Sequence, residues 1–300
     1  MTHADISVVL PVHRGVVPAH LERALRSIAE QTALPREVIL VEDGPLDSGH
    51  DLAIRRVRLP GLKRIRLEVN QGAGVANQAG LEAASSTWIA KCDADDVNVP
   101  DRFERQFAVV TETGAELCGS AMLEFVGAES DVRNYRATPL THEAIVRRLP
   151  VNNPINHPTA FFNREVALRV GGYPEWRYMQ DYGLFMRLVF GGARMVNLPE
   201  PLVLFRSGEQ FTRRRRSTGV RQCERHVQRS LHELGFVSAP RMWFNLAWRL
   251  AFRRLPAPIL ALVYKRMLSQ SASPHRDLSR RKMRGAIPAA SPPERSTNFQ

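Results

Sequence analysis

The chain has 300 residues, of which 44% are apolar and 24% charged, so it can bury a full core as one large domain or two smaller ones. Three cysteines without metal-like spacing argue against a disulfide scaffold and indicate a reducing compartment. No run of about 18 apolar residues is present, and Ile6–Val12 is too short and lacks a basic leader, so we expect neither a membrane-spanning helix nor a signal peptide.

The net charge of +12 is concentrated in the last third of the chain. Residues 201–300 carry 20 Lys and Arg against 5 Asp and Glu, whereas residues 1–200 carry 22 against 25. Such a basic segment attracts polyanions in general, so a nucleic-acid-binding protein is one interpretation. The sequence has no zinc motif and no aromatic platform beside the run Arg213–Arg216, which disfavours nucleic acid as the partner.

Short apolar runs alternate with helical patterns over the first hundred residues. Apolar side chains recur at helical spacing between the first two runs, at Leu21, Leu25 and Ile28, and again over residues 75–84. The alternation predicts an α/β fold, with a mostly parallel sheet, right-handed crossovers and helices on both faces. The runs are Ile6–Leu10, Val38–Val41, Ile65–Val69 and Trp88–Ala90.

Each of these runs ends in polar residues. Parallel sheets bind ligands outside the carboxyl ends of their strands, so we expect the four polar clusters to share one rim. A turn explains any single cluster equally well, but turns alone do not explain why all four fall on the same rim. The clusters are Pro11–His13, Glu42–Gly44, Asn70–Gly72 and Asp93–Asp96.

The last cluster holds three carboxylates within four positions. On an extended chain, residues two apart face the same side about 6–7 Å from each other, so Asp93 and Asp95 are predicted to grip one divalent cation. A metal bound in this way keeps positions open for substrate phosphates. The alternative is that Asp95 and Asp96 cap a following helix that has Pro100 in its first turn.

The glycines at residues 72–77 suggest the fingerprint of a dinucleotide-binding fold, but the pattern does not match that fingerprint. The third glycine is replaced by Asn77, and three strands precede the pattern instead of one. A nicotinamide-dependent enzyme is therefore a weak alternative.

The second half of the chain begins with a proline-rich loop over residues 150–158, followed by a strand from Thr159 to Phe162. Gly171–Pro174 marks a turn, after which apolar spacing predicts a helix with Asp181 in or near its first turn. An acid there is also a plain partner of the helix dipole.

With these residues in place, the chain resembles the family 2 glycosyltransferases of the GT-A fold, which build bacterial surface polysaccharides and exopolysaccharides. The resemblance runs from about Ile6 to Arg206. It implies transfer of one sugar, with inversion, from a nucleotide-diphosphate sugar, expected to be a UDP-sugar, to a saccharide acceptor, expected to be lipid-linked. The implied cofactor is Mg²⁺ or Mn²⁺. The motifs that carry the resemblance are Ser7–Val12, Val41–Gly44, Asn70–Gly72 with Asn77, Asp93–Asp96 with Pro100, Arg102 and Gln106, Gly171–Tyr173, Gln180–Tyr182 and Pro199–Leu202.

The resemblance also assigns roles to individual residues. Asp43 would contact the nucleotide base, Asp93 the ribose or sugar, and Asp95 the metal on the diphosphate. Asp181 would be the catalytic base. His157 belongs to the donor site on the same grounds, although a structural histidine remains the alternative, as a helix-start role does for Asp181. The remaining nucleotide-sugar-binding residues are Pro11, Asn70, Gly72 and Asn77.

Two departures from the family pattern matter. Relatives commonly show Glu-Asp-Tyr-Asp where this chain has Gln180–Gly183, so a catalytically impaired relative is an alternative, although the predicted base is kept. The Gln-x-x-Arg-Trp pattern of processive members is missing, which favours addition of a single sugar.

We expect three parts: a catalytic domain at residues 1–215, amphipathic helices at 216–268 and a disordered basic tail at 269–300. Met242, Trp243, Leu246 and Leu250 form one apolar helical face, and Ile259–Tyr264 adds a second apolar stretch, a pattern typical of helices at a membrane interface. The predicted location is the cytoplasm, at the anionic inner face of the plasma membrane. Packing of these helices on the catalytic domain is the alternative, and Arg213–Arg216 is either a lid over the diphosphate or a solvated loop.

Overall fold

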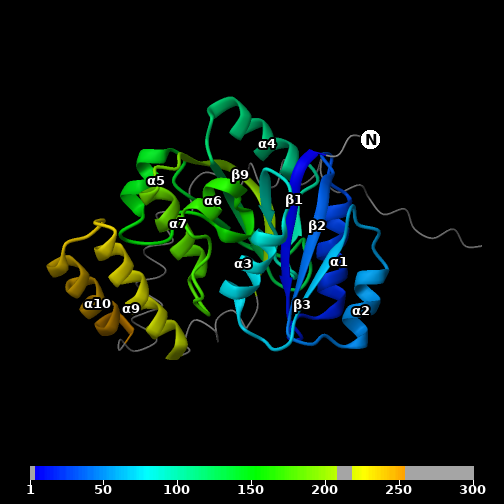
Figure 1. Cartoon of the computed structure of the whole chain (residues 1–300), viewed down its shortest axis with the longest axis horizontal. Coiled ribbons are helices and arrows are strands. Elements are labelled where there is room, and N and C mark those ends of the chain that lie inside the picture. The colour runs from blue at the N-terminus through cyan, green and yellow to red at the C-terminus, as the bar shows by residue number, and fades with distance from the viewer. Residues whose placement is uncertain (1–3, 208–217, 254–300) are drawn as a thin grey trace, which may run out of the picture. The chain divides into compact units, whose positions relative to one another are not determined.

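The computed structural model describes residues 4–207 and 218–253. Nine strands of this described chain form one sheet in the order β3-β2-β1-β4-β8-β6-β9-β5, with β7 paired to β6 (Figure 1). The strands are β1 (Ala4–Val12), β2 (Pro35–Asp43), β3 (Lys63–Leu67), β4 (Trp88–Lys91), β5 (Val97–Asn98), β6 (Leu117–Phe125), β7 (Val132–Arg136), β8 (Phe161–Asn163) and β9 (Met195–Arg206). The four predicted runs are therefore neighbouring parallel strands, which confirms the predicted α/β class.

Strand β1 runs past the point where the sequence predicted its end. Pro11 pairs in register with Val41, and the strand continues to Val12. The carbonyl of Val9 accepts a hydrogen bond from Cys92 N–H on the β4 side, and Pro11, two residues further, faces the same way. The β1–β4 ladder has already ended at the Val9–Lys91 pair, so the missing N–H of Pro11 breaks no ladder bond.

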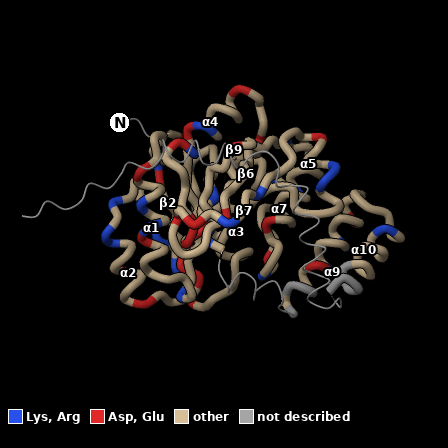
Figure 2. The backbone as a smooth tube through the Cα atoms, turned by 180° about the vertical axis from the view of Figure 1, so that it is seen from behind, with Lys and Arg blue, Asp and Glu red and all other residues tan. Residues whose placement is uncertain are grey.

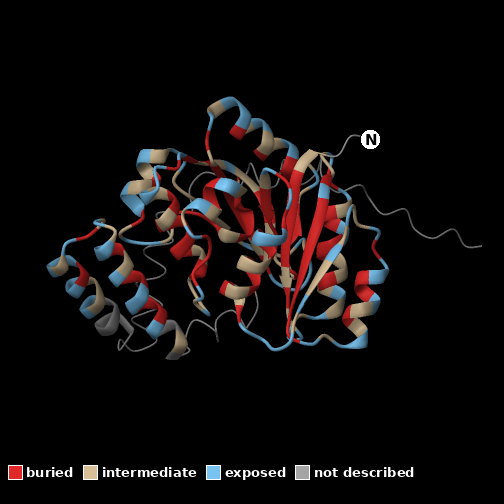
Figure 3. Cartoon of the chain, viewed as in Figure 1, coloured by how far each residue is buried: buried red, intermediate tan, exposed pale blue. Residues whose placement is uncertain are grey.

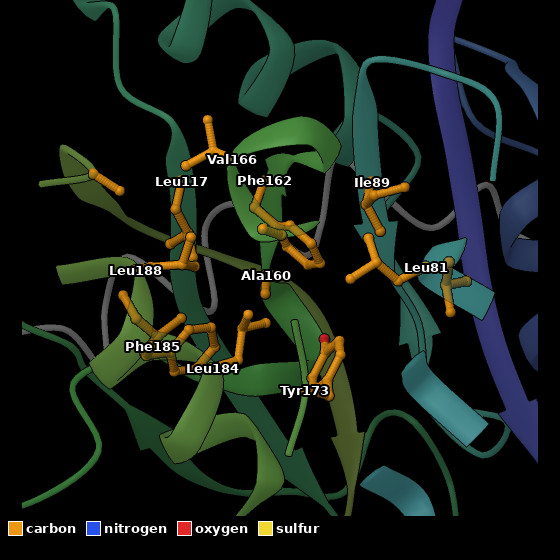
Figure 4. Close-up of a cluster of buried hydrophobic side chains, with 14 of the residues drawn as sticks. Leu81, Ile89, Leu117, Ala160, Phe162, Val166, Tyr173, Leu184, Phe185 and Leu188 are labelled. Atoms are coloured by element: carbon orange, nitrogen blue, oxygen red, sulfur yellow. The ribbon is translucent and has the colours of Figure 1, made fainter. Parts of the chain in front are cut away.

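Helices cover both faces of the sheet, as predicted. On one face, α1 (Pro18–Ala29), α2 (Ser48–Arg55) and α4 (Arg102–Thr113) pack against the side chains of Ile6, Val8 and Leu10. On the other face, α3 (Ala73–Ala83), α6 (Arg164–Arg169) and α7 (Gln180–Phe190) pack against Val9 and the neighbouring strands (Figure 4). Strands β1 and β2 are consequently buried along most of their length (Figure 3).

The second half of the sheet is mixed. Strand β8 lies antiparallel between β4 and β6, and β9 runs parallel to β6 and antiparallel to β5. The strand predicted from Thr159 begins only at Phe161, because residues His157–Thr159 form a short 3₁₀ turn, η1. Helix α5 (His142–Arg148) precedes this turn, at the start of the loop that leads to the site.

Two further helices, α9 (Thr218–Glu233) and α10 (Ala239–Arg253), follow the sheet. They lie side by side beyond α7 (Figures 1 and 2), and Val227, Leu231 and Met242 share a hydrophobic cluster with Tyr182 and Met186 of α7. Residues 213–216, 259–264 and 269–300, for which a lid, a second apolar stretch and a disordered tail were predicted, lie outside the described residues. Within the described chain, no helix combines the length and the apolar character needed to cross a bilayer.

Candidate active site

A cavity of about 680 Å³ opens at the carboxyl ends of β1, β2 and β4. The structure brings every predicted site residue to its lining, although these residues come from six separate segments of the chain. Lys91, Arg177 and Gln180 also line the cavity, and none of them was predicted as a site residue. The predicted residues are Pro11, Asp43, Asn70, Gly72, Asn77, Asp93, Asp95, His157 and Asp181.

Asp43, the last residue of β2, is buried and holds the turn that follows β3. Its Oδ1 accepts the N–H of Gln71 at 2.7 Å, and its Oδ2 accepts the N–H of Gly72 at 3.1 Å and Nδ2 of Asn70 at 2.9 Å. Gly72 has φ 94°, a conformation that favours glycine. Asp43 therefore fixes the N-terminal end of α3, where Asn77 lies.

The acidic cluster is a turn, not the extended segment predicted from the sequence. Ala94 and Asp95 occupy the turn, and the N–H of Asp96 points to the carbonyl of Asp93 at 3.4 Å. Arg206, at the end of β9, donates its backbone N–H to Asp96 Oδ1 at 2.8 Å and its Nε to the carbonyl of Asp95 at 3.0 Å. The alternative helix-cap role of Asp95 and Asp96 is wrong, because α4 begins only at Arg102.

The electrostatics of this turn suit a cation. Burial raises the pKa of Asp96 well above its usual range, and the negative charges of Asp95 and Asp93 raise it further. Its Oδ2 is buried without a hydrogen-bond partner among the described residues. In the described chain no three metal-ligating side chains converge, so a Mg²⁺ or Mn²⁺ ion here would take one or two carboxylates and leave its other positions to phosphate and water.

Lys91 is a site residue that sequence reasoning missed. Its side chain is 1% exposed, and its ammonium donates to the carbonyl of Cys92 at 2.6 Å and to Asp93 Oδ1. A lysine at the end of a buried strand was the available signal, since such residues are rarely buried without a charged partner. Lys91 partly neutralises Asp93 and leaves the negative charge of the turn concentrated toward Asp95.

Two polar residues of α4 hold the floor of the site. Arg102, fully buried, donates from Nη2 to the carbonyl of Lys91 at 2.9 Å, and Gln106 donates from Nε2 to the carbonyls of Cys118 and Thr159, both at 2.8 Å. These residues, one helical turn apart, tie the end of β4 to the η1 turn. They therefore fix the backbone that carries Asp93 on one side and His157 on the other.

His157 contacts Tyr173 and faces the cavity. The distance from His157 Nε2 to the Tyr173 hydroxyl is 2.9 Å, and the edge of the ring packs toward Phe185. Burial lowers the pKa of His157 to about 3, with a smaller contribution from the positive charge of Lys91, so the imidazole is neutral at physiological pH. The residue therefore has a structural partner and a place in the cavity lining, which leaves both interpretations open.

Asp181 is the second residue of α7 and projects toward the cavity. Two positions earlier stands Met179, which at φ 59° is the one non-glycine residue of the described chain in the left-handed region. Burial raises the pKa of Asp181 to about 6, and the charge of Asp93 adds to the effect. Backbone N–H groups at the helix start and the amide of Asn153, whose Nδ2 lies 2.7 Å from Asp181 Oδ2, oppose the rise. The carboxylate is thus mostly ionised at pH 7 and still basic enough to accept a proton.

The segment Tyr173–Arg177 crosses the start of α3, and its last residue, Arg177, lines the cavity. A Cβ on Gly74 would lie 2.4 Å from the carbonyl oxygen of Pro174 and 2.6 Å from that of Trp176, so only glycine fits at this crossing. Arg177 then donates from Nη2 to Asn70 Oδ1 at 3.0 Å. The glycines that suggested a dinucleotide fingerprint in the sequence therefore make room for another part of the same chain.

The chain is similar in sequence to known glycosyltransferases. Residues 7–172, more than half of the chain, match Glycosyl transferase family 2. The amylovoran biosynthesis glycosyltransferase AmsE of Erwinia amylovora is 30% identical over 265 residues, covering 87% of this chain and 98% of its own. The UDP-Gal:alpha-D-GlcNAc-diphosphoundecaprenol beta-1,3-galactosyltransferase of Escherichia coli is 27% identical over 264 residues, covering 87% of this chain and 96% of its own.

Solved structures show the same fold. TarS 1–349 of S. aureus, in complex with UDP-GlcNAc, superposes with a TM-score of 0.63 at 17% identity, covering 82% of this chain and 71% of that chain. The predicted GT-A fold, a mostly parallel sheet flanked by helices, is thereby confirmed. The matched segment, the relative of 30% identity along nearly its full length and the shared fold lead to one conclusion: the chain belongs to the family 2 glycosyltransferases and is a nucleotide-sugar glycosyltransferase of polysaccharide biosynthesis.

Proposed function

We propose that the protein transfers a single sugar, with inversion, from a UDP-sugar to a lipid-linked saccharide. The observation that carries the proposal is the pairing, across one cavity, of the acidic turn at Asp93–Asp95 with Asp181, whose pKa is raised to about 6. The named activity of the E. coli relative supports both substrate classes. The UDP-GlcNAc complex of the structural neighbour supports a nucleotide sugar as donor.

The residues divide the work between the two substrates. Asp95, with Asp93, would hold Mg²⁺ or Mn²⁺, which when bound neutralises the charge of the departing diphosphate. Asp43 and the turn from Asn70 to Gly72 shape the nucleoside side together with Pro11 and Asn77. Asp181 accepts the proton of the acceptor hydroxyl as that hydroxyl attacks, and attack from the side opposite the diphosphate inverts the anomeric centre.

The two acids missing around Asp181 do not argue for an impaired enzyme. A Cβ on Gly183 would lie 2.5 Å from Pro174 Cγ and 3.1 Å from Trp176 Cζ3, so the segment that crosses α3 leaves no space for an acidic side chain there. Gln180 is buried in the wall of the cavity. Both departures fit the packing of this chain and leave the carboxylate of Asp181 in place.

The test is a screen of nucleotide sugars with the full chain, Mn²⁺ and a diphosphoundecaprenol-linked sugar as acceptor. We expect one donor to give a product that is longer by one sugar, with an inverted anomeric configuration by NMR. The variant Asp181→Asn serves as the control for background hydrolysis. Products with retained configuration, or products extended by many sugars, would contradict the proposal.

We further propose that α10 holds the enzyme at an anionic membrane. The predicted apolar face of this helix is divided in the structure: Met242 and Leu246 pack on the cluster shared with α7, whereas Trp243 is 65% exposed. Phe244 and Trp248, which were not part of that face, are 59% and 61% exposed. Exposed aromatic side chains on a helix within a basic segment are typical of interfacial binding. Arg225 and Arg229 are exposed on the adjacent α9, and each cation near an anionic leaflet contributes about 1 kcal/mol.

Sedimentation with vesicles of phosphatidylglycerol and phosphatidylcholine tests this attachment. The double variant Trp243→Ser/Trp248→Ser should lose most vesicle binding, because the two indole rings supply much of the apolar contact. Phe190→Ser is a matched control, since Phe190 is 63% exposed at the end of α7. Undiminished sedimentation of the double variant would exclude α10 as the anchor. Retention on DNA that survives moderate salt would favour nucleic acid as the partner instead.

A further inference from the structure

Asn153 lies in the loop between α5 and η1, 28 positions before Asp181, yet its side chain reaches the Asp181 carboxylate. Nδ2 of Asn153 is 2.7 Å from Asp181 Oδ2. In the sequence, Asn153 falls in the proline-rich loop over residues 150–158, and nothing in the local pattern shows which distant residue its amide contacts.

The orientation of the Asn153 amide follows from its other contacts. Its Oδ1 accepts the backbone N–H of Ile155 at 3.2 Å, and its own backbone N–H donates to Asn152 Oδ1 at 2.9 Å. A backbone N–H can only donate, so the oxygen of the amide must face Ile155. The NH₂ group is therefore the one that faces Asp181, and it cannot turn away without losing the bond to Ile155.

We propose that Asn153 is a positioning residue for Asp181. Its amide holds one oxygen of the Asp181 carboxylate in place and keeps that carboxylate ionised, ready to accept the proton of the acceptor. This inference rests on the proposed function, in which Asp181 is the base. An amide N–H binds a carboxylate more tightly than a carboxylic acid, so the contact favours the ionised form. Geometry and charge thus act together at the same atom.

The other ionisable groups around Asp181 do not replace this contact. Asp93, in the turn after β4, raises the pKa of Asp181, and its own negative charge is partly offset by Lys91. Tyr173 has a pKa raised well above its usual range and His157 a pKa lowered to about 3, so both are neutral near pH 7. The first turn of α3, residues 73–76, holds no ionisable side chain. On α9, the ring of His226 packs against Trp176, with 5.8 Å between the two ring centroids.

The experiment compares the pH dependence of kcat/KM for the full chain with that of Asn153→Ala. The acid limb of the parent should have its midpoint near 6, and in the variant it should move up by about one pH unit, since the lost hydrogen bond favours the ionised form. At pH 6 the ionised fraction of Asp181 then falls from about one half to about one tenth, so transfer falls about fivefold relative to the loss at pH 8. Affinity for UDP with Mn²⁺ should not change.

Two further variants separate positioning from a general structural role. Val151→Ala shortens a side chain of the same loop that is 52% exposed, and its acid limb should coincide with that of the parent. Asn153→Asp keeps the shape and places a second acid beside Asp181, so its acid limb should move further than that of Asn153→Ala. Equal loss of transfer at every pH in both Asn153 variants would overturn the inference.

A readout that does not depend on turnover keeps this test separate from that of the proposed function. The carboxyl ¹³C resonance of Asp181, assigned by its loss in Asp181→Asn, can be titrated in the parent and in Asn153→Ala. A higher pKa in the variant supports the contact even if no donor is found. An unchanged pKa overturns the inference even if the enzyme transfers sugar as proposed.

Discussion

Two carboxylates face the same cavity and are held in opposite ways. Asp43 ends a buried parallel strand, and both of its oxygens accept hydrogen bonds from the turn at residues 70–72. Asp181 lies two positions after Met179, whose backbone is in the left-handed region. Its carboxylate accepts a hydrogen bond from the side-chain amide of Asn153, and its pKa is raised to about 6. We call the regions around them the parallel half, residues 4–91, and the mixed half, residues 117–206.

The difference shows how one sheet would carry the proposed donor binding in one half and the proposed proton transfer in the other. In the parallel half, regular strand ends bring polar groups to a rim, and those groups first stabilise each other. In the mixed half, an irregular backbone holds a carboxylate in a place where burial disfavours its charge. Backbone in a sparsely populated conformation and a carboxylate with a raised pKa are typical of sites that perform chemistry.

The largest expected effect lies in the acidic turn at the edge of the parallel half. Asp95→Ala should abolish the metal-dependent part of UDP binding, because the proposed ligand of the ion is removed. The melting temperature should stay within a few degrees of the parent, since Asp95 is partly exposed. Isothermal titration calorimetry with UDP and Mn²⁺ measures the first quantity. Unchanged Mn²⁺-dependent affinity would show that Asp95 is not the metal ligand.

The matching change in the mixed half should separate transfer from donor binding. Asp181→Asn keeps the shape of the side chain and removes its ability to accept a proton, so transfer should fall roughly 10²-fold or more. Affinity for UDP with Mn²⁺ should persist. If donor binding were lost in step with transfer, the contrast between the halves would fail, and Asp181 would belong to the donor site.

A third change addresses the contact between the halves. Gly74→Ala places a methyl group against the carbonyl oxygens of Pro174 and Trp176, and overpacking of this kind costs about 1–3 kcal/mol. The displaced segment precedes Asp181, so we expect transfer to fall about tenfold as well. Gly114→Ala is the control, because the added carbon has no atom within 4 Å there and any loss comes from the positive φ of 67° alone. Equal transfer by both variants would show that the crossing does not position Asp181.

The smallest effect concerns stability. The pKa of Asp181 is about 6 in the folded chain, against an ordinary value of 3.8 in the unfolded chain. Ionisation of Asp181 therefore opposes folding fully above pH 6 and has no effect at pH 3, where the carboxyl group is protonated in both states. Asp181→Asn should therefore raise the free energy of unfolding at pH 8 by about 1–2 kcal/mol, because the full shift is worth about 3 and partial exposure reduces it. Urea unfolding at pH 8 and pH 3 measures the difference, and a variant that is less stable at pH 8 would contradict the assignment.

The sequence predicted the parallel half more completely than the mixed half. The spacing of apolar residues and the ends of the apolar runs locate Asp43, Asn70 and Asp93, because parallel strands bring their carboxyl ends to one rim whatever their side-chain contacts are. They cannot show that the chain turns at Ala94 and Asp95, since that turn depends on Arg206, more than a hundred residues away.

In the mixed half the missed residues have long-range partners. The contact of Asn153 with Asp181 and that of Arg177 with Asn70 join segments 28 and 107 positions apart. Neither leaves a period or a spacing in the sequence. Asp181 itself was predicted only through its resemblance to a family, because an acid in the first turn of a helix is ordinary on physical grounds.

The crossing of Tyr173–Arg177 over α3 also decides where the chain can be cut or recombined. A fragment that ends at residue 172, where the family match stops, would keep β1 to β8 but lose both Asp181 and the segment that covers Gly74. In a hybrid that takes its mixed half from a relative, the relative's counterpart of Tyr173–Arg177 would have to pack on Gly72 and Gly74 of this chain. Exchange of acceptor preference between such enzymes is therefore a graft of two pieces, in which the start of α3 must travel with the segment that lies across it.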